Sequence, residues 1–182
     1  AFPDLPDVLP TSDVMRHGID SLEQGRWLQG NGGVWTWRVD GYPGDVLDVE
    51  VLPDGRAFAS TRDGQVVSWY GGQWTSQPIT TGEALFDLAS DQANGIIAVG
   101  ERGRILRWDG ASWSFEESGT DATLRGVGSL GPALAIAVGD YVILESQGAS
   151  WSEIPFGPPK ELNAISVRPQ SDAWAVGRHG VV

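Results

Sequence analysis

The sequence contains no cysteine and only two histidines, His17 and His179, among its 182 residues. Without cysteine there is no disulfide framework and no thiolate metal site. Neither histidine lies in a recognisable nucleophile motif, so nothing supports a Ser-His-Asp catalytic triad. A glycine-rich phosphate loop is also missing. We therefore expect no enzymatic activity, no metal and no cofactor, although carboxylates alone would still suffice for Ca²⁺.

Basic residues and long apolar segments are scarce as well. The chain has 12 lysines and arginines against 24 aspartates and glutamates, which gives a net charge of −12. An acidic surface of this kind repels phosphate backbones, so we expect no nucleic-acid partner. Because no apolar run approaches the roughly 18 residues of a membrane-spanning helix, we also expect no membrane insertion.

Tryptophan, by contrast, is abundant and regularly spaced. Four of the nine tryptophans recur at intervals of 39, 39 and 38 residues, and each is followed by serine or threonine: Trp35, Trp74, Trp113 and Trp151. A glycine stands three positions before each of them: Gly32, Gly71, Gly110 and Gly148. An aliphatic residue stands eleven positions after each: Val46, Leu85, Leu124 and Leu162. These features in register establish a repeat of about 39 residues.

Each copy of the repeat contains four short segments with the character of β-strands. In the copy 85–123 they are "LFDLAS", "IIAVG", "RILRW" and "SWSFEES". The second segment is apolar at every position but its last, which predicts burial on both faces between neighbouring sheets. Four strands in about 39 residues is the size of one β-propeller blade. We therefore predict an all-β propeller of four-stranded blades.

The repeat divides the chain into an N-terminal proline-rich arm and five full or partial copies: 1–22 for the arm, then 23–45, 46–84, 85–123, 124–161 and 162–182. Residues 23–45 match only the second half of a copy, and 162–182 only its beginning. Two arrangements follow from this. Either the two partial copies join into one composite blade and give about four blades, or the chain is part of a propeller of six to eight blades.

A residue that recurs in every copy is expected to have a structural role, whereas one that recurs in only some copies is a candidate ligand contact. The four periodic tryptophans are predicted to pack blade against blade, because every blade meets its neighbour in the same way. The four periodic glycines are predicted to supply positive φ in hairpin turns. Trp69 and Trp108 recur in only two copies, so we expect them to be exposed ligand contacts.

Charged residues at equivalent places form two further sets of candidate ligand contacts. Asp48 and Asp87 share a position on the first strand, which lines the channel of a propeller. We expect solvated channel carboxylates, while a cation site or a glycosidase pair with Arg125 nearby is the alternative. The turns between the second and third strands carry a basic residue in several copies and are predicted to form a ring of mixed charge: Arg62, Arg102 and Arg178.

The pattern "AVGERGRILRWDGASW" resembles bacterial β-propellers of the photosystem II assembly/stability-factor-like type. It is also similar to Asp-box (bacterial neuraminidase) repeats, but Leu106 and Trp108 stand where that motif has Ser and Asp. The regular blades, the acidic surface and the missing catalytic set favour a non-catalytic interaction or ligand-binding module. The resemblance implies that this module is extracellular or in the cell envelope (periplasm or outer surface). Its partner would be a protein or a glycan at one propeller face. A lectin propeller and a glycoside-acting enzyme are the alternative functions.

Overall fold

A computed structural model of the chain describes residues 14–17, 26–31, 34–39, 44–91, 93–157, 160–168 and 172–178. Apart from one short 3-10 helix, η1 (Glu101–Gly103), the regular structure of these residues is β-strand. The strands are β1 (Val14–His17), β2 (Arg26–Asn31), β3 (Val34–Val39), β4 (Val46–Val51), β5 (Ala57–Thr61), β6 (Gln65–Tyr70), β7 (Gln73–Thr80), β8 (Leu85–Ser90), β9 (Ile96–Gly100), β10 (Ile105–Trp108), β11 (Trp113–Glu116), β12 (Leu124–Gly131), β13 (Leu134–Gly139), β14 (Ile143–Gln147), β15 (Ser150–Glu153), β16 (Leu162–Val167) and β17 (Ala173–Gly177).

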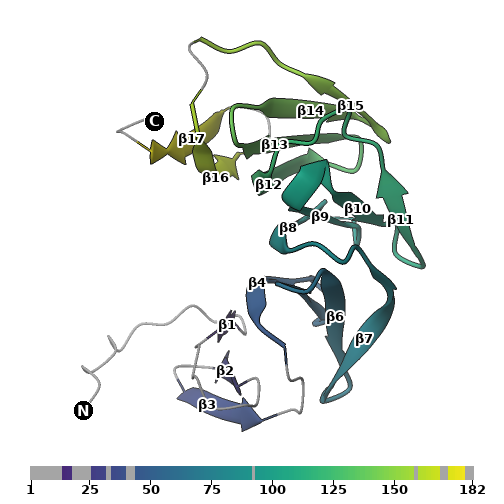
Figure 1. The fold of residues 1–182 in the computed structure, drawn as a ribbon. Coiled ribbons are helices and arrows are strands. Elements are labelled where there is room, and N and C mark those ends of the chain that lie inside the picture. Colours follow the sequence, from purple (N-terminus) through teal and green to yellow (C-terminus); the bar gives the residue numbers. More distant parts are fainter. Residues whose placement is uncertain are drawn as a thin grey trace.

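The strands form five antiparallel sheets, of which three are complete four-stranded blades: β4–β7, β8–β11 and β12–β15. They are flanked by the three-stranded sheet β1-β2-β3 and the two-stranded sheet β16-β17. Figure 1 shows the sheets following one another around an arc, with β4, β8, β12 and β16 on its inner side. Each of these inner strands lies against the next. The predicted all-β propeller of four-stranded blades is therefore confirmed.

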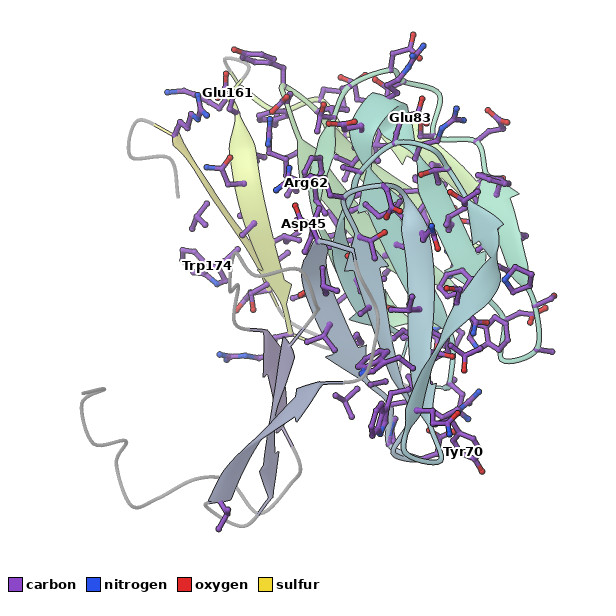
Figure 2. All side chains as sticks on the ribbon, turned by 60° about the horizontal axis from the view of Figure 1, so that its bottom comes forward. Asp45, Arg62, Tyr70, Glu83, Glu161 and Trp174 are labelled. Atoms are coloured by element: carbon purple, nitrogen blue, oxygen red, sulfur yellow. The ribbon has the colours of Figure 1, made fainter. Side chains whose placement is uncertain are left out.

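We name the strands of a blade A to D from the channel outward. Because a blade is an antiparallel meander, its B–C turn and the connection from D to the next A lie at one end, here called the B–C face. The A–B and C–D turns lie at the other end, the A–B face. In Figure 2, Glu83 and Glu161 mark the B–C face, and Tyr70, in a C–D turn, marks the A–B face.

The first sheet begins with β1, inside the segment that the sequence indicated as an arm. Its register on β2, with His17 opposite Trp27, is that of β9 on β10, where Val99 lies opposite Ile105. β1 thus occupies the place of strand B. In the part of the chain that the structure describes, β17 pairs only with β16. Among the described residues, β1 therefore stands beside β2 at the place that the composite blade would give to β17, and β16 and β17 form a sheet of their own.

The core lies between the blades, because strand B buries alternate side chains against alternate neighbours. On β9, Ile96 and Ala98 belong to the cluster shared with β4–β7, which contains Phe58. Ile97 and Val99 belong to the cluster shared with β12–β15. The sequence predicted that the second strand is buried on both faces, and its position between two cores explains why. β5 and β9 are buried along their full length.

The glycine that ends strand B in two complete blades and in the sheet β16-β17 is required for space: Gly100, Gly139 and Gly177. A Cβ at Gly139 would overlap the carbonyl oxygen of Thr123, the residue before strand A of the same blade. The next amide, that of Asp140, donates to that carbonyl at 2.9 Å. The close approach of strands A and B at the B–C face therefore excludes a side chain at this position.

Replacing Gly139 by alanine is expected to lower the free energy of unfolding by about 1–3 kcal/mol, because the backbone of β12 must move away from the new methyl group. Urea denaturation measures the change. Gly157→Ala is the matched control, since a Cβ at Gly157 meets nothing within 4 Å and its φ lies outside the left-handed region. Equal effects of the two substitutions would contradict this account.

Candidate functional site

Each inner strand carries a bulge at the same point. The pairing of strand A with strand B shifts register between Val46 and Asp48, between Leu85 and Asp87, and at the equivalent places of β12 and β16. A bulge bends its strand and re-aims the neighbouring side chains. Asp48 and Asp87 directly follow the bulge, so the bulge determines the direction in which their carboxylates point.

These carboxylates are bridges from one blade to the next. The amide of Leu88 on β8 donates to Oδ2 of Asp48 at 2.8 Å, and the amide of Val127 on β12 donates to Oδ2 of Asp87 at 2.8 Å. A third bridge runs from the amide of Ser90 to Oε1 of Glu50 at 3.1 Å. An inner strand has a partner strand on only one side, so its channel-side amides need other acceptors. The carboxylates of the preceding blade fill that need.

The expectation that Asp48 and Asp87 are merely solvated channel groups is therefore wrong. Both are half-buried, and each has an oxygen committed to the backbone of the next blade. Burial, and after it the negative charge of Asp48, raise the pKa of Asp87 to about 7 against the opposing effect of the hydrogen bond from the amide of Val127. Burial also raises the pKa of Glu50.

The third copy of this position is Gly126, which leaves the junction between β12 and β16 without a carboxylate. A Cβ at Gly126 would lie 3.1 Å from the Cα of Ala164 and from the amide nitrogen of Ile165. Close backbone approach thus takes the place of the bridge there.

A different kind of inter-blade bridge lies at the outer edge. Glu116 on β11 forms an ion pair with Arg107 of its own blade and accepts a hydrogen bond from Nε1 of Trp151 on β15 at 2.7 Å. Arg107 also reaches the carbonyl of Gly148 in the next blade at 3.3 Å. The side chain of Glu116 is almost fully buried. The sequence repeat contains no signal for this network, because Gln77 and Ile154 stand at the equivalent places.

Two periodic tryptophans, Trp113 and Trp151, pack against clusters shared by two adjacent blades, whereas Trp74 packs against a cluster within its own blade. Trp74, Trp113 and Trp151 are half-buried against the three hydrophobic clusters, whereas the side chain of Trp35 lies outside the described residues. The turn glycines behind them, Gly71, Gly110 and Gly148, have φ of 64°, 101° and 69°. Gly32 also lies outside the described residues.

Trp69 and Trp108, the two tryptophans that recur in only two copies, do not lie where exposed ligand contacts would. Trp69 is only 8% exposed and packs against Trp74, with ring centroids 5.5 Å apart. Trp108 is half-buried between Phe58 and Trp113. Its Nε1 is buried and has no hydrogen-bond partner among the described residues. The expected exposure of these rings is therefore wrong, because each pairs across its hairpin with the periodic tryptophan.

The basic residues of the B–C turns are held by acids of their own blades. Arg62 pairs with Asp45 at 3.2 Å, and Arg178 pairs with Glu161 at 3.0 Å. Their side chains nevertheless remain 63% and 64% exposed. Figure 2 shows Arg62 beside Asp45. The mixed charge expected of these turns is present as ion pairs between a B–C turn and the residue just before strand A.

The remaining groups of this face connect adjacent blades. Arg125 forms two hydrogen bonds to Asp140, at 2.7 and 3.0 Å, and lies over the ring of Phe86 in the preceding blade. These bonds raise the pKa of Arg125. Tyr141, at φ 65°, donates its hydroxyl to Glu161 of the next blade at 3.0 Å, which raises the pKa of Tyr141.

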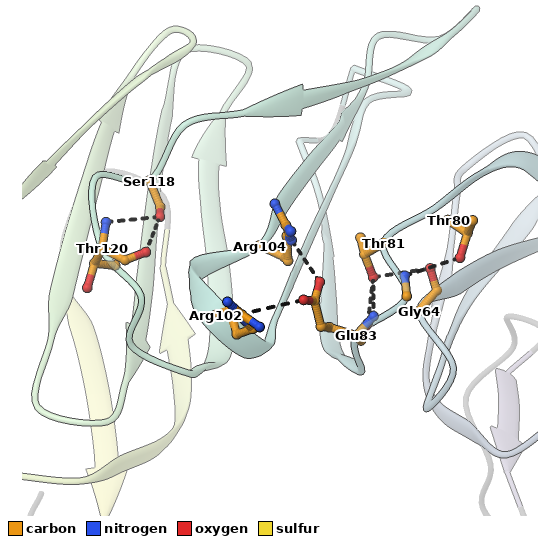
Figure 3. A network of polar contacts seen from close by, with 9 residues as sticks. Gly64, Thr80, Thr81, Glu83, Arg102, Arg104, Ser118 and Thr120 are labelled. Atoms are coloured by element: carbon orange, nitrogen blue, oxygen red, sulfur yellow. Dashed lines mark hydrogen bonds and ion pairs between the residues drawn. The ribbon is translucent and has the colours of Figure 1, made fainter.

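A groove of about 610 Å³ opens farther out on the B–C face. One side is the connection that follows β7, at Thr81, and the other is the blade β8–β11. Figure 3 shows Glu83 between the guanidinium groups of Arg104 and Arg102, which lie 2.9 and 3.7 Å from its carboxylate. Both arginines line the groove together with Phe115 and the turn 117–121.

In the portion described, no three His, Cys, Asp or Glu side chains gather into a metal-binding group. None of the helices described there is long and apolar enough to cross a bilayer. Within that portion, Asp48 and Asp87 therefore belong to no such group.

Comparison with known proteins supports the fold. No family model and no curated protein matches the sequence. YCF48 from Cyanidioschyzon merolae matches with a TM-score of 0.68 at 16% identity, covering 87% of this chain and 62% of YCF48. A structure of YCF48 bound to D1 peptide matches with a TM-score of 0.66 at 16% identity, covering 97% and 64%. BamB from Moraxella catarrhalis has a TM-score of 0.65 at 15% identity, covering 95% and 54%.

These similarities establish the β-propeller architecture. At 15–16% sequence identity they show the fold and nothing about function. The chain spans less than two thirds of the length of each of the three structures.

Replacing Asp87 by asparagine is expected to remove a pH dependence of stability. The pKa of Asp87 is about 7 in the folded chain and 3.8 as an ordinary value, so the folded state holds the extra proton between these values. The free energy of unfolding of the wild type therefore falls as the pH rises from about 4 to about 7, and the loss is complete above that. Asparagine still accepts from Val127 and carries no charge.

Urea denaturation at about pH 5 and about pH 8 measures this slope, and we expect D87N to exceed the wild type at the higher pH by about 1 kcal/mol or more. Glu153→Gln, which neutralises an exposed carboxylate on β15, is the control and keeps the wild-type slope. An unchanged slope in D87N would contradict the assignment.

Glu116→Ala is expected to destabilise the chain by about 3 kcal/mol, because it leaves Arg107 half-buried without its counter-charge and removes the acceptor of Trp151. Trp151→Phe removes only the hydrogen bond and should cost about 1 kcal/mol. Thermal or chemical unfolding measures both. Glu117→Ala, at the exposed neighbouring position, should stay within about 0.5 kcal/mol of wild type. If E117A matched E116A, the outer bridge would contribute nothing.

Proposed function

We propose that this chain is a non-catalytic β-propeller module that binds a protein partner at its B–C face. We further propose that it acts outside the cytoplasm of a bacterium, secreted or in the cell envelope, as the repeat pattern suggests. The observation that carries the proposal is the set of exposed polar side chains on this face, each fixed by a partner within the fold. Arg62, Tyr141 and Arg178 project from three different sheets, β4–β7, β12–β15 and β16-β17, and remain 56–64% exposed.

Fixing these groups before binding favours recognition. An exposed arginine ordinarily loses rotamer freedom when a partner immobilises it, which weakens association. Here Asp45 and Glu161 already hold Arg62 and Arg178, while the outer guanidinium nitrogens stay accessible. A partner that presents backbone carbonyls and carboxylates would find these guanidinium donors already oriented. One of the similar structures is YCF48 bound to D1 peptide, which supports a peptide segment as the kind of partner.

A glycoside-acting function receives less support. A retaining glycosidase needs one carboxylate free to attack and one free to donate a proton. Asp48 and Asp87 each have an oxygen engaged by a backbone amide of the next blade, so their chief role is structural. Trp69, which a sugar platform would expose, is buried.

A selection of linear peptides displayed on phage against the immobilised chain tests the proposal. We expect enriched peptides whose affinity falls about tenfold or more in the double variant Arg62→Glu/Arg178→Glu. Arg168→Glu is the matched control: Arg168 is exposed in the A–B turn of the sheet β16-β17, at the opposite end. Failure to enrich any peptide, or equal binding by the double variant, would count against the B–C face as the binding surface.

A further inference from the structure

The groove on the B–C face combines one aromatic wall with polar groups of both signs. Phe115 on β11 is 54% exposed, although it points to the same side of its strand as the half-buried Trp113. Ser76 and Glu153 occupy the equivalent position in the neighbouring blades, so the repeat does not require an aromatic residue there. The ring of Phe115 is thus an apolar face on a concave surface that is otherwise polar.

The charges around the groove exclude some ligand classes. Arg102 and Arg104 share the single carboxylate of Glu83, and Glu117 and Asp121 add two more negative charges from the neighbouring turn. Glu116 is neutralised by Arg107. The groove therefore carries one more negative than positive charge, which disfavours an acidic polymer. A neutral ligand would meet donors and acceptors at once.

Of the two arginines that line the groove, Arg102 is less engaged within the fold. It lies 3.7 Å from Glu83, whereas Arg104 lies at 2.9 Å, and its side chain is 71% exposed. Its backbone holds φ at 54°, a left-handed conformation that is costly for a residue other than glycine. Arg102 lies in the turn beside the groove. The next residue, Gly103, packs closely against the carbonyl oxygen of Thr120, which lies on the other side of that turn.

We propose that this groove binds a neutral saccharide of one or two sugar units. The apolar face of a sugar ring stacks on Phe115, the guanidinium of Arg102 donates to ring hydroxyls, and the carboxylates of Glu117 and Asp121 accept from them. A volume of about 610 Å³ accommodates such a ligand. The site lies on one blade and the adjoining connection, away from Arg62 and Arg178. It does not depend on the proposed protein partner.

Titration of the ¹⁵N-labelled chain with cellobiose, maltose, lactose and diacetylchitobiose tests the proposal by NMR. At least one disaccharide should shift the amide signals of Gly103 and Gly119 at millimolar concentration. Phe115→Ala should weaken that binding about tenfold, corresponding to about 1.4 kcal/mol, and Phe115→Trp should retain it. Arg102→Ala should also weaken it. Tyr70→Ala, which removes an aromatic ring 73% exposed on the A–B face, is the matched control.

The proposal is overturned if none of the four disaccharides shifts these amides, or if the shifts survive Phe115→Ala. A lysine-rich peptide that shifts the same amides in a Phe115-dependent manner, with no effect of the sugars, would assign the groove to a cationic peptide instead and would equally overturn it. Because Arg62 and Arg178 do not line the groove, R62E/R178E should leave sugar binding unchanged. The two proposals therefore fail or succeed separately.

Discussion

Every complete blade must bury both faces of its sheet against a neighbour, and the rest of the structure follows from this requirement. A single four-stranded sheet of this length cannot hide strand B, whose side chains are apolar on both sides. Stacking gives those side chains two cores, one with each neighbour. The inner strands are thereby brought side by side, where their channel edges lack strand partners. Carboxylates of the preceding blade then accept hydrogen bonds from the unpaired amides of these edges, which adds polar contacts to the hydrophobic ones between blades.

The same requirement determines where recognition can occur. The faces of the complete blades are packed against neighbouring sheets. The channel carboxylates accept hydrogen bonds from backbone amides of the next blade. Turns and connections remain, since their side chains are not needed between sheets. At the B–C face these side chains are paired with acids, so the surface is ordered without being buried. The groove beside η1 lies on this face too, where the connection from β7 leaves space against the outer half of the next blade.

The repeat period predicted the architecture because packing between blades imposes the same residues at the same places. Trp113, Gly110 and Leu124 recur for that reason. The prediction failed where a residue's role depends on one neighbour alone. Trp69 and Trp108 are not periodic, yet they pair with periodic tryptophans and lose their exposure. The bridging role of Asp48 and Asp87 depends on a bulge and on the edge of the next strand, neither of which is visible in the residue type. Glu116 occurs once and gave no pattern to detect.

The bridges at the channel have a direction. Each acceptor, Asp48, Glu50 or Asp87, lies on the earlier blade, and each amide that it satisfies lies on the later one. During synthesis a nascent chain therefore presents the carboxylate before the strand edge that needs it has been made. The blades β8–β11 and β12–β15 therefore emerge beside an inner strand that already carries their acceptor, which is compatible with assembly in the order of translation. The aspartates thereby make these two junctions directional, which hydrophobic packing alone would not do.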